Sequence, residues 1–367
     1  MFFFFMFAFT LLMTFYVTLR GWQVLADVGN LRYWYIGFNI ILFLSLLAGM
    51  IFPNAMPQPV AKAVTFAGYS YMLIVIYLLL SFLMTDVVRI LNLAFHFAPA
   101  GMKTLRLWMF AGSAAIIFVS MIIGNYKFNH PKVVHLNLTA EKPLQHKKIR
   151  IVAASDIHLG VSIDKSRLKK YVSLMNAQNP DIVLLAGDVS DRSTIPLVKQ
   201  KMEEEFWQIK APMGIYAVSG NHEYYSENPY ATAQYLQKSG ITFLRDSVAL
   251  VDNDFYVVGR DDKTNHHRKT LAEIEKGIDP AKPVILLDHQ PFNLEAAENN
   301  VDLQISGHTH DGQFFPGNWF VKRMYELGHG YLKKGKTHYY VSSGLGLWGP
   351  QYRIGTQSEL VVIDFEY

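Results

Sequence analysis

Five short loops rich in aspartate, asparagine and histidine organise the second part of this chain. Each loop directly follows a short apolar run, such as 149–154, 182–186 or 283–287. Runs of this length and composition predict strands that are buried on both faces of a sheet. The loops read Asp156-Ile157-His158, Gly187-Asp188-Val189-Ser190-Asp191, Gly220-Asn221-His222-Glu223, Asp288-His289-Gln290-Pro291 and Gly307-His308-Thr309-His310.

Loops at the carboxyl ends of such strands are where α/β proteins carry their sites. The five loops are therefore expected to bring carboxylates, an amide and imidazoles together, and all of these bind metal ions. Cysteine is absent from the sequence, which excludes disulfides, thiolate ligands and a cysteine nucleophile. Any metal site must therefore be built from nitrogen and oxygen ligands.

The five motifs, in this order, resemble those of the calcineurin-like metallophosphoesterase superfamily. The resemblance covers roughly residues 148–367 and implies an α/β fold, the four-layer αββα metallophosphoesterase sandwich, with two divalent metal ions at the loops. The segments 258–262, 307–313 and 342–346, together with the apolar first third of the chain, resemble the membrane-associated YkuE-like branch of that superfamily.

The resemblance also implies a role for each motif residue. It assigns the ligands of two ions, with Asp188 as the bridge: Asp156, His158, Asp188 and His310 for one ion, and Asp188, Asn221, His289 and His308 for the other. A metal-bound hydroxide would attack phosphorus. His222 matches the family histidine that stabilises the developing charge or protonates the leaving oxygen, and Asp191 matches the residue that orients it. Glu223 is expected to be structural.

Two residues are candidate substrate contacts. Asn221 is one, and Arg353 is the other because a guanidinium suits phosphate oxygens. A surface salt bridge is the alternative for Arg353. Asp311 would tune the His310 metal, contact the substrate or have an ordinary surface role. The mixed oxygen and nitrogen ligands suit Mn, Fe or Zn and leave the choice among these metals open.

The first third of the chain has a different composition. Residues 1–126 hold six Lys/Arg and two Asp/Glu, whereas residues 127–367 hold twenty-eight of each. Four apolar stretches are close to the roughly 20 residues that cross a hydrocarbon core; they lie at about 1–18, 34–52, 66–85 and 106–125. Residues 1–126 are therefore predicted to form an α-helical transmembrane region of four spans. Buried core helices of a soluble protein are the alternative.

A polar segment, 127–147, follows the last predicted span and leads into the catalytic domain at 148–367. It is predicted to be a linker or an edge strand. Within the domain, helices are expected at 164–177, 195–209 and 229–238, and Asp164 can cap the first of them. Short β-type runs follow, which suggest hairpin-like strands of a second sheet; they are 241–243, 248–250 and 255–258.

The distribution of basic residues predicts the orientation of the spans. The first and third connecting loops carry more of them than the opposite side; they are Arg20, Arg32, Arg89, Lys103 and Arg106 against Lys62, Lys127 and Lys132. The positive-inside rule then places both termini and the catalytic domain outside, on a bacterial cytoplasmic membrane. Asp86, at the end of the third span, is either an interfacial residue that reaches headgroup water or pairs with Arg89, or part of a pathway.

The resulting interpretation is a membrane-anchored, metal-dependent phosphoric ester hydrolase, a phosphatase or phosphodiesterase that cleaves a phosphoester or pyrophosphate bond. The bilayer is the expected partner. The aromatic stretch 314–325, which would lie in the membrane interface or pack on the domain, suggests a lipid-linked substrate. The alternative function is a catalytically silent membrane sensor or binding protein that retains the metal site. Because residues 127–367 are nearly neutral and lack a basic run, no nucleic-acid partner is expected. The oligomeric state stays open.

Overall fold

The computed structural model describes residues 2–97, 101–226 and 228–367, with side chains from residue 7 onward in these ranges. The chain divides into two compact units. Unit 1 comprises 1–124 and 349–351, and unit 2 comprises 125–348 and 352–367.

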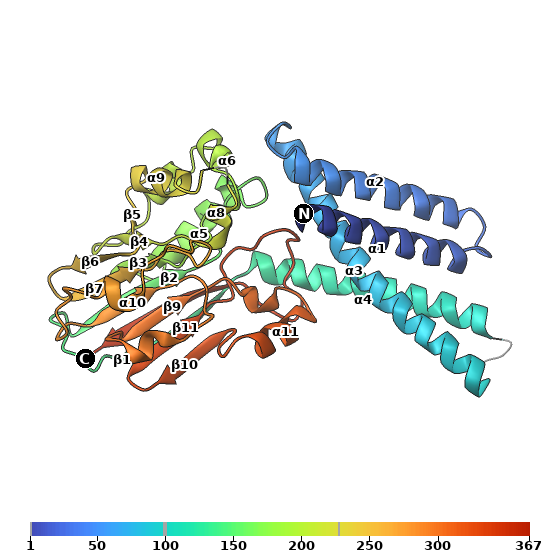
Figure 1. The fold of residues 1–367 in the computed structure, drawn as a ribbon. Coiled ribbons are helices and arrows are strands. Elements are labelled where there is room, and N and C mark those ends of the chain that lie inside the picture. Colours follow the sequence, from blue (N-terminus) through green and yellow to red (C-terminus); the bar gives the residue numbers. More distant parts are fainter. Residues whose placement is uncertain (1, 98–100, 227) are drawn as a thin grey trace. The chain divides into compact units, whose positions relative to one another are not determined.

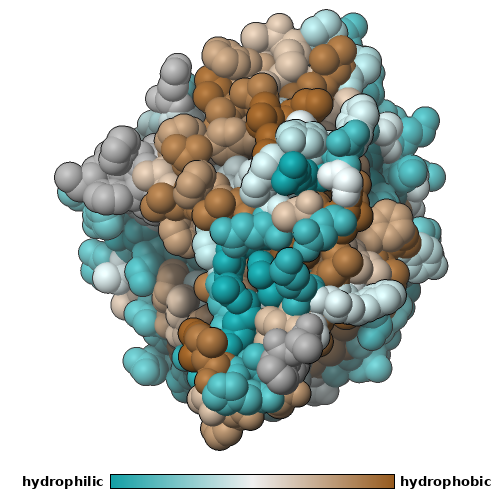
Figure 2. Space-filling view, turned by 90° about the vertical axis from the view of Figure 1, so that its right-hand side faces the viewer, coloured by the Kyte–Doolittle hydropathy of each residue, from teal (hydrophilic) through white to brown (hydrophobic). Residues whose placement is uncertain are grey.

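Unit 1 consists of long apolar helices, which are drawn in blue and cyan in Figure 1: α1 (Phe2–Val24), α2 (Leu31–Ile51), α3 (Gln58–Phe95) and most of α4 (Met102–Asn129). Large apolar side chains point outward from them, such as Trp34, Ile41, Leu93 and Ile116, each at least half exposed. Figure 2 shows broad hydrophobic areas on the face that it turns to the viewer. A helix that is apolar all round suits lipid better than water.

Three helices among the described residues, α2, α3 and α4, are long and apolar enough to cross a membrane. They contain most of the predicted spans at 34–52, 66–85 and 106–125. The first predicted span falls in α1, but Met1 and the side chains of 2–6 lie outside the described residues, so the count of four is not confirmed. Helix α3 is longer than predicted, with 38 residues, and the residue that follows its last residue, His96, has a left-handed φ of 52°.

Asp86, the acidic residue of α3, is fully engaged within unit 1. It accepts a hydrogen bond from Tyr16 Oη at 2.7 Å and pairs with Arg89 at 3.1 Å and with Arg20. Of the two alternatives for Asp86, this pairing favours the interfacial residue, because its charge is already compensated.

The described part of unit 2 contains two six-stranded sheets. The first has the order β1-β12-β2-β3-β4-β5, from β1 (Lys132–Thr139), β12 (Glu359–Glu366), β2 (Lys148–Ala154), β3 (Ile182–Leu185), β4 (Ile215–Ala217) and β5 (Thr242–Phe243). The second has the order β10-β11-β9-β8-β7-β6, from β10 (Gly330–Lys334), β11 (Thr337–Val341), β9 (Leu303–Ser306), β8 (Val284–Leu287), β7 (Phe255–Gly259) and β6 (Ser247–Val251). In each sheet the central strands are parallel.

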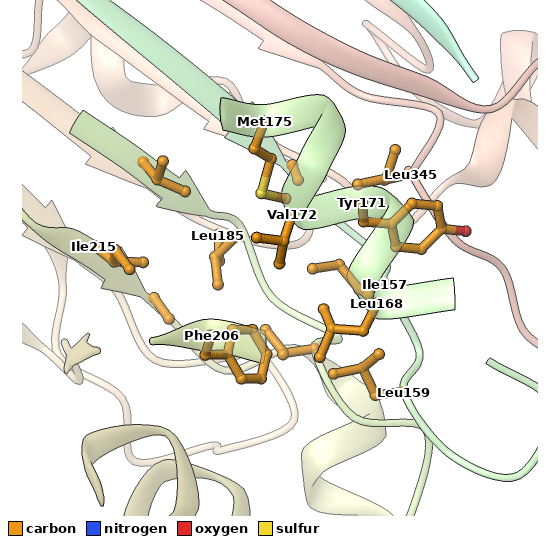
Figure 3. Packing of buried hydrophobic residues seen from close by; sticks show 14 of the residues in the cluster. Ile157, Leu159, Leu168, Tyr171, Val172, Met175, Leu185, Phe206, Ile215 and Leu345 are labelled. Atoms are coloured by element: carbon orange, nitrogen blue, oxygen red, sulfur yellow. The ribbon is translucent and has the colours of Figure 1, made fainter. Parts of the chain in front are cut away.

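The sheets pack face to face, and helices cover their outer faces. Ile151 and Leu184 of the first sheet share a buried cluster with Ile285 and Ile305 of the second. On the outer face of the first sheet, Leu168 and Val172 of α5 (Lys165–Asn176) contact the strands (Figure 3). On the outer face of the second sheet, α10 (Leu271–Ile274) packs on β7 and β8. The layers therefore follow the order helix, sheet, sheet, helix.

Some local predictions agree with these elements. The Asp164 side chain accepts a hydrogen bond from Arg167 N at 3.1 Å and caps α5. The helix expected at 229–238 is α9 (Ala231–Lys238). Segment 127–147 contains β1, which pairs in register along β12 at the sheet edge. Its alternation of exposed and half-buried side chains suits an edge strand.

Two local predictions are wrong. The single helix expected at 195–209 is broken into α6 (Ile195–Lys199) and α7 (Glu203–Phe206), because Lys201 has a φ of 50° and Met202 N bonds back to Leu197 O at 3.0 Å. Strand β5 belongs to the first sheet rather than the second, since it pairs with β4. Only β6 and β7 form the expected hairpin.

Candidate metal centre

The site lies where the carboxyl ends of five central strands meet. Loops after β2, β3 and β4 carry the first three motifs, and loops after β8 and β9 carry the last two. Several of the side chains stand on strained backbone: φ is positive at Asp156 (52°), His158 (53°), Asp188 (51°), His308 (71°) and His310 (52°). Such strain concentrates at functional sites, where the surrounding structure enforces it.

Close approach between the loops requires glycine at two positions. A Cβ on Gly220 would overlap the Asp188 carboxylate, and a Cβ on Gly307 would overlap that of Asp156. The loops are tied to each other by backbone hydrogen bonds from Asp156 N to Gly187 O (3.0 Å) and from His158 N to Asp188 O (2.9 Å). The two glycines therefore permit the carboxylates to lie against neighbouring loops.

One group of buried side chains gathers around Asp156. His310 Nε2 lies 3.4 Å from Asp156 Oδ1, and His158 Nε2 lies 3.9 Å from the same oxygen. The two imidazole nitrogens are 3.2 Å apart. The three residues form a group whose ligand atoms are close enough to share one metal ion.

Asp188 joins this group to a second one. Its Oδ2 lies 3.6 Å from His158 Nε2 and 3.3 Å from His289 Nε2. Beyond His289, the Nδ1 atom of His308 lies 2.7 Å from Asn221 Oδ1. The close groups of ligand atoms contain five of the seven predicted ligands: Asp156, His158, Asp188, His289 and His310. His308 and Asn221 lie next to them, since the His289 and His308 rings are 5.3 Å apart.

The buried imidazole nitrogens of the site suit metal ions better than hydrogen bonds among themselves. His289 Nδ1 lies 2.8 Å from Ala186 O, and its buried Nε2 lies 3.3 Å from Asp188 Oδ2. Burial opposes protonation, but the carboxylates of Asp188 and Asp156 raise the pKa of His289 well above its usual value, and a cation at Nε2 would take the place of that proton. Burial lowers the pKa of His158 to about 3 and holds the pKa of His310 well below its usual range. Two neutral imidazoles then face each other at 3.2 Å, and a shared cation would satisfy both lone pairs.

His222 lies beside this group and is held by Asp191. The Nδ1 atom of His222 is 2.7 Å from Asp191 O and 3.0 Å from Asp191 Oδ1, and its ring stands edge-on to His158 with centroids 4.5 Å apart. Burial opposes its protonation, but the carboxylates of Asp188 and Asp191 outweigh burial and raise the pKa of His222 to about 9. Asp191 therefore fixes the orientation of the imidazole, and the raised pKa favours its protonated form.

Glu223 connects the loops after β3 and β4. Its carboxylate accepts hydrogen bonds from Gly220 N (2.7 Å), Ser190 N (2.9 Å) and Asp188 N (3.2 Å). Burial and the nearby Asp188 raise its pKa to about 7. These contacts are consistent with the structural role expected for Glu223, because they fix the backbone that carries Asp188.

For Arg353, the alternative of a surface salt bridge is wrong, and the predicted phosphate contact stays a prediction that its burial disfavours. The side chain is fully buried, and it donates to the carbonyl oxygens of His310 (2.8 Å), Ser343 (2.7 Å) and Gly346 (2.8 Å). Neither a surface salt bridge nor an open phosphate contact fits this environment. The Nη1 and Nη2 groups instead donate to backbone carbonyls that converge beneath the His310 loop, and Nε donates to Ser358 Oγ at 3.1 Å.

Replacing Arg353 should therefore reduce stability rather than substrate affinity. We expect Arg353→Met to lower the free energy of unfolding by about 3–5 kcal/mol, since several buried carbonyls lose their donor. Thermal unfolding of the full chain in detergent would measure the loss, with Lys238→Met at an exposed site on α9 as the matched control. A raised KM at unchanged stability would contradict this expectation.

The sequence did not single out an aromatic rim around the centre. Tyr225 Oη lies 3.2 Å from Asn221 Nδ2, and the Trp348 and His222 rings are 6.0 Å apart. On the other side, Phe292 lies 5.9 Å from the His308 ring. Tyr225 and Phe292 each stand three positions after a motif histidine, and that adjacency is the signal that could have identified them.

Asp288, the remaining acidic residue of the motif loops, does not contribute to either group. Its carboxylate pairs with Arg260 at 3.3 Å and with Arg268 at 3.1 Å. Asp311 lies 3.9 Å from His329 and is half-buried. Both carboxylates therefore have cationic partners outside the cluster of predicted ligands.

Known proteins are similar to this chain in sequence. A family model described as calcineurin-like phosphoesterase matches residues 149–312. An uncharacterized metallophosphoesterase of Aquifex aeolicus (strain VF5) is 31% identical over 257 residues, which cover 67% of this chain and 97% of that protein. YkuE, an uncharacterized metallophosphoesterase of Bacillus subtilis (strain 168), is 27% identical over 272 residues, 65% of this chain and 89% of that protein.

A larger relative has a name that mentions the membrane. The "Transmembrane protein with metallophosphoesterase domain" of Danio rerio is 33% identical over 250 residues, which cover 64% of this chain, and the match spans 57% of that protein's length. The family match, the Aquifex relative and the gathered motif residues agree with one another. This chain belongs to the calcineurin-like metallophosphoesterase family.

Proposed function

We propose that the protein is a membrane-anchored dimetal phosphohydrolase that cleaves a phosphoester or pyrophosphate bond. The observation that carries the proposal is the position of Asp188 Oδ2, 3.6 Å from His158 Nε2 and 3.3 Å from His289 Nε2. A short carboxylate between two buried imidazoles is the arrangement that a bridged pair of cations requires.

The residues that would hold the two ions are those that the resemblance assigns: Asp156, His158, Asp188 and His310 for the first, and Asp188, Asn221, His289 and His308 for the second. The close groups formed by Asp156, His158 and His310 and by Asp156, Asp188 and His289 support this assignment. Two divalent cations there would lower the pKa of water and neutralise phosphate charge. Mn, Fe and Zn each suit these oxygen and nitrogen donors.

His222 is the proposed catalytic residue outside the ligand set. Asp191 holds its Nδ1, so that Nε2 is left to donate a proton to the leaving oxygen or to stabilise charge on the phosphoryl group. Asn221 and the rim residues would contact the remainder of the substrate.

The proposed location is a bacterial cytoplasmic membrane, with the catalytic unit facing outward. Support comes from the apolar helices α2, α3 and α4 and from the excess of basic residues in two connecting loops. A relative whose name includes "Transmembrane protein" also supports membrane anchoring. A phosphohydrolase tethered to a bilayer by its own chain would have bilayer-resident phosphate esters within reach, which favours a lipid-linked substrate.

Metal removal and restoration test the proposed activity. The full chain in detergent would be stripped with a chelator, reloaded with Mn, Fe or Zn, and assayed with mono-, di- and pyrophosphate esters. We expect chelation to reduce turnover by at least about a hundredfold and one of the metals to restore it.

The same experiment separates the enzyme from the alternative, a silent sensor or binding protein. Two bound metal ions per chain without turnover of any ester would contradict the hydrolase and favour the sensor. Turnover that is insensitive to chelation would contradict the dimetal site itself.

A further inference from the structure

Helix α11 (Gly317–Met324) displays large apolar side chains that are about half exposed or more. It follows the His310 loop, and none of its described residues is buried. Trp319 is 47% exposed, Phe320 55% and Met324 68%. With Phe315, four exposed aromatic or thioether side chains thus occur within ten described residues. A concentration of exposed apolar side chains marks a protein or membrane interaction site more often than an ordinary surface.

The charge of α11 suits an anionic surface. Its basic residues are Lys322 and Arg323, and its sequence contains no acidic residue. The Arg323 guanidinium lies 3.7 Å from the centroid of the Trp319 ring. A short amphipathic helix that combines basic residues with exposed Trp and Phe is typical of a segment that lies in the interface of a bilayer.

Aromatic rings connect α11 to the metal centre. Tyr325 directly follows the helix and lies 4.9 Å from the ring of Phe292, which in turn lies 5.9 Å from His308. Lys263 lies over the Phe292 ring, with Nζ 4.1 Å from its centroid. An apolar group that enters along α11 would therefore meet apolar surface up to the proposed ligands.

The covalent connection keeps unit 2 within reach of the bilayer that α4 would cross. Helix α4 ends at Asn129 and β1 begins at Lys132, so two residues join them. Two extended residues span about 7 Å. The last turn of α4, from Asn125 onward, already belongs to unit 2. A bilayer crossed by α4 would therefore be tethered to unit 2 through this short connection.

We propose that α11 lies in the headgroup interface of the anchoring bilayer, and that Tyr325 and Phe292 receive the apolar part of a bilayer-resident phosphate ester beside His308. The proposal rests on the proposed membrane-anchored hydrolase and names its substrate class. It also gives the bilayer a second point of contact with the chain, on the catalytic unit itself.

Because the chain has no cysteine, one introduced cysteine can be labelled uniquely. The full chain carrying Phe320→Cys would be labelled with bimane and reconstituted in vesicles of phosphatidylcholine and phosphatidylglycerol, with and without doxyl-labelled lipid. We expect doxyl lipid to quench the label at position 320 at least about threefold more than a label introduced by Lys238→Cys on α9. Equal quenching at the two positions would overturn the interfacial location.

A second arm tests delivery of the substrate. Combined Trp319→Ser and Phe320→Ser should lower hydrolysis of a vesicle-embedded phosphate ester about tenfold and leave hydrolysis of soluble bis-p-nitrophenyl phosphate within about twofold. Trp207→Ser, at an exposed site beside α7, is the matched control. An equal loss on both esters, or on neither, would overturn the delivery role.

The outcomes of these two experiments can be told apart from a failure of the proposed hydrolase activity. If the unsubstituted chain cleaves neither ester with its metals restored, the proposed function is wrong, and quenching at position 320 still decides where α11 lies. If it cleaves the soluble ester but no embedded one, the hydrolase stands and the substrate class proposed here is wrong.

Discussion

Asp188→Asn is expected to lower kcat/KM by about three orders of magnitude and to reduce the bound metal from two ions per chain to one or none. The Asp188 carboxylate is buried between His158 and His289, and its other oxygen accepts a hydrogen bond from His222 N at 2.9 Å. Asparagine has the same shape but lacks the charge and the second acceptor oxygen, so it cannot bridge two cations. Its amide group would also present a donor where a ligand is needed.

Metal analysis and steady-state kinetics on the same preparation would check this expectation. Asp279→Asn removes an exposed carboxylate of unit 2 and serves as the matched control, with unchanged metal content and turnover. Thermal unfolding in the presence of chelator would separate loss of metal from loss of the fold. Two retained ions and normal turnover in Asp188→Asn would contradict the bridged centre.

The second large effect is expected at His222. His222→Ala should reduce kcat by about 10²–10⁴-fold and leave both metal ions bound, because the imidazole is proposed to act as an acid beside the metals. Its Nδ1 is engaged by Asp191, which leaves one nitrogen for the substrate. The loss should be larger for an alkyl ester than for a p-nitrophenyl ester, whose leaving group needs little protonation.

Asp191→Asn provides the companion measurement. It should cost roughly tenfold, since it disturbs the orientation of His222 without removing the imidazole. His158, Asp191 and His222 are themselves close enough to hold a metal. If His222→Ala loses an ion, or loses activity equally on both esters, His222 is a ligand or a structural residue rather than an acid.

Local sequence determined the elements that carry the centre. Short apolar runs such as 182–185 favour buried strands, and the polar residues that directly follow them then lie at the strand ends. The ordered motifs at five such ends, with their resemblance to a known family, predicted Asp188 as a metal ligand and His222 as a catalytic residue before any coordinates. A strand and the loop that follows it are neighbours along the chain, so the sequence pattern predicts both.

The tertiary structure decided what depends on contacts between distant segments. Arg353 lies beneath the His310 loop only because the chain returns there after β11, and no local pattern distinguishes that position from a phosphate contact. The same holds for β5, whose sheet is set by its neighbour β4, and for Phe292 and Tyr325, which meet beside His308. Burial and partners are properties of the packed molecule, so they could be read only once its sheets were in place.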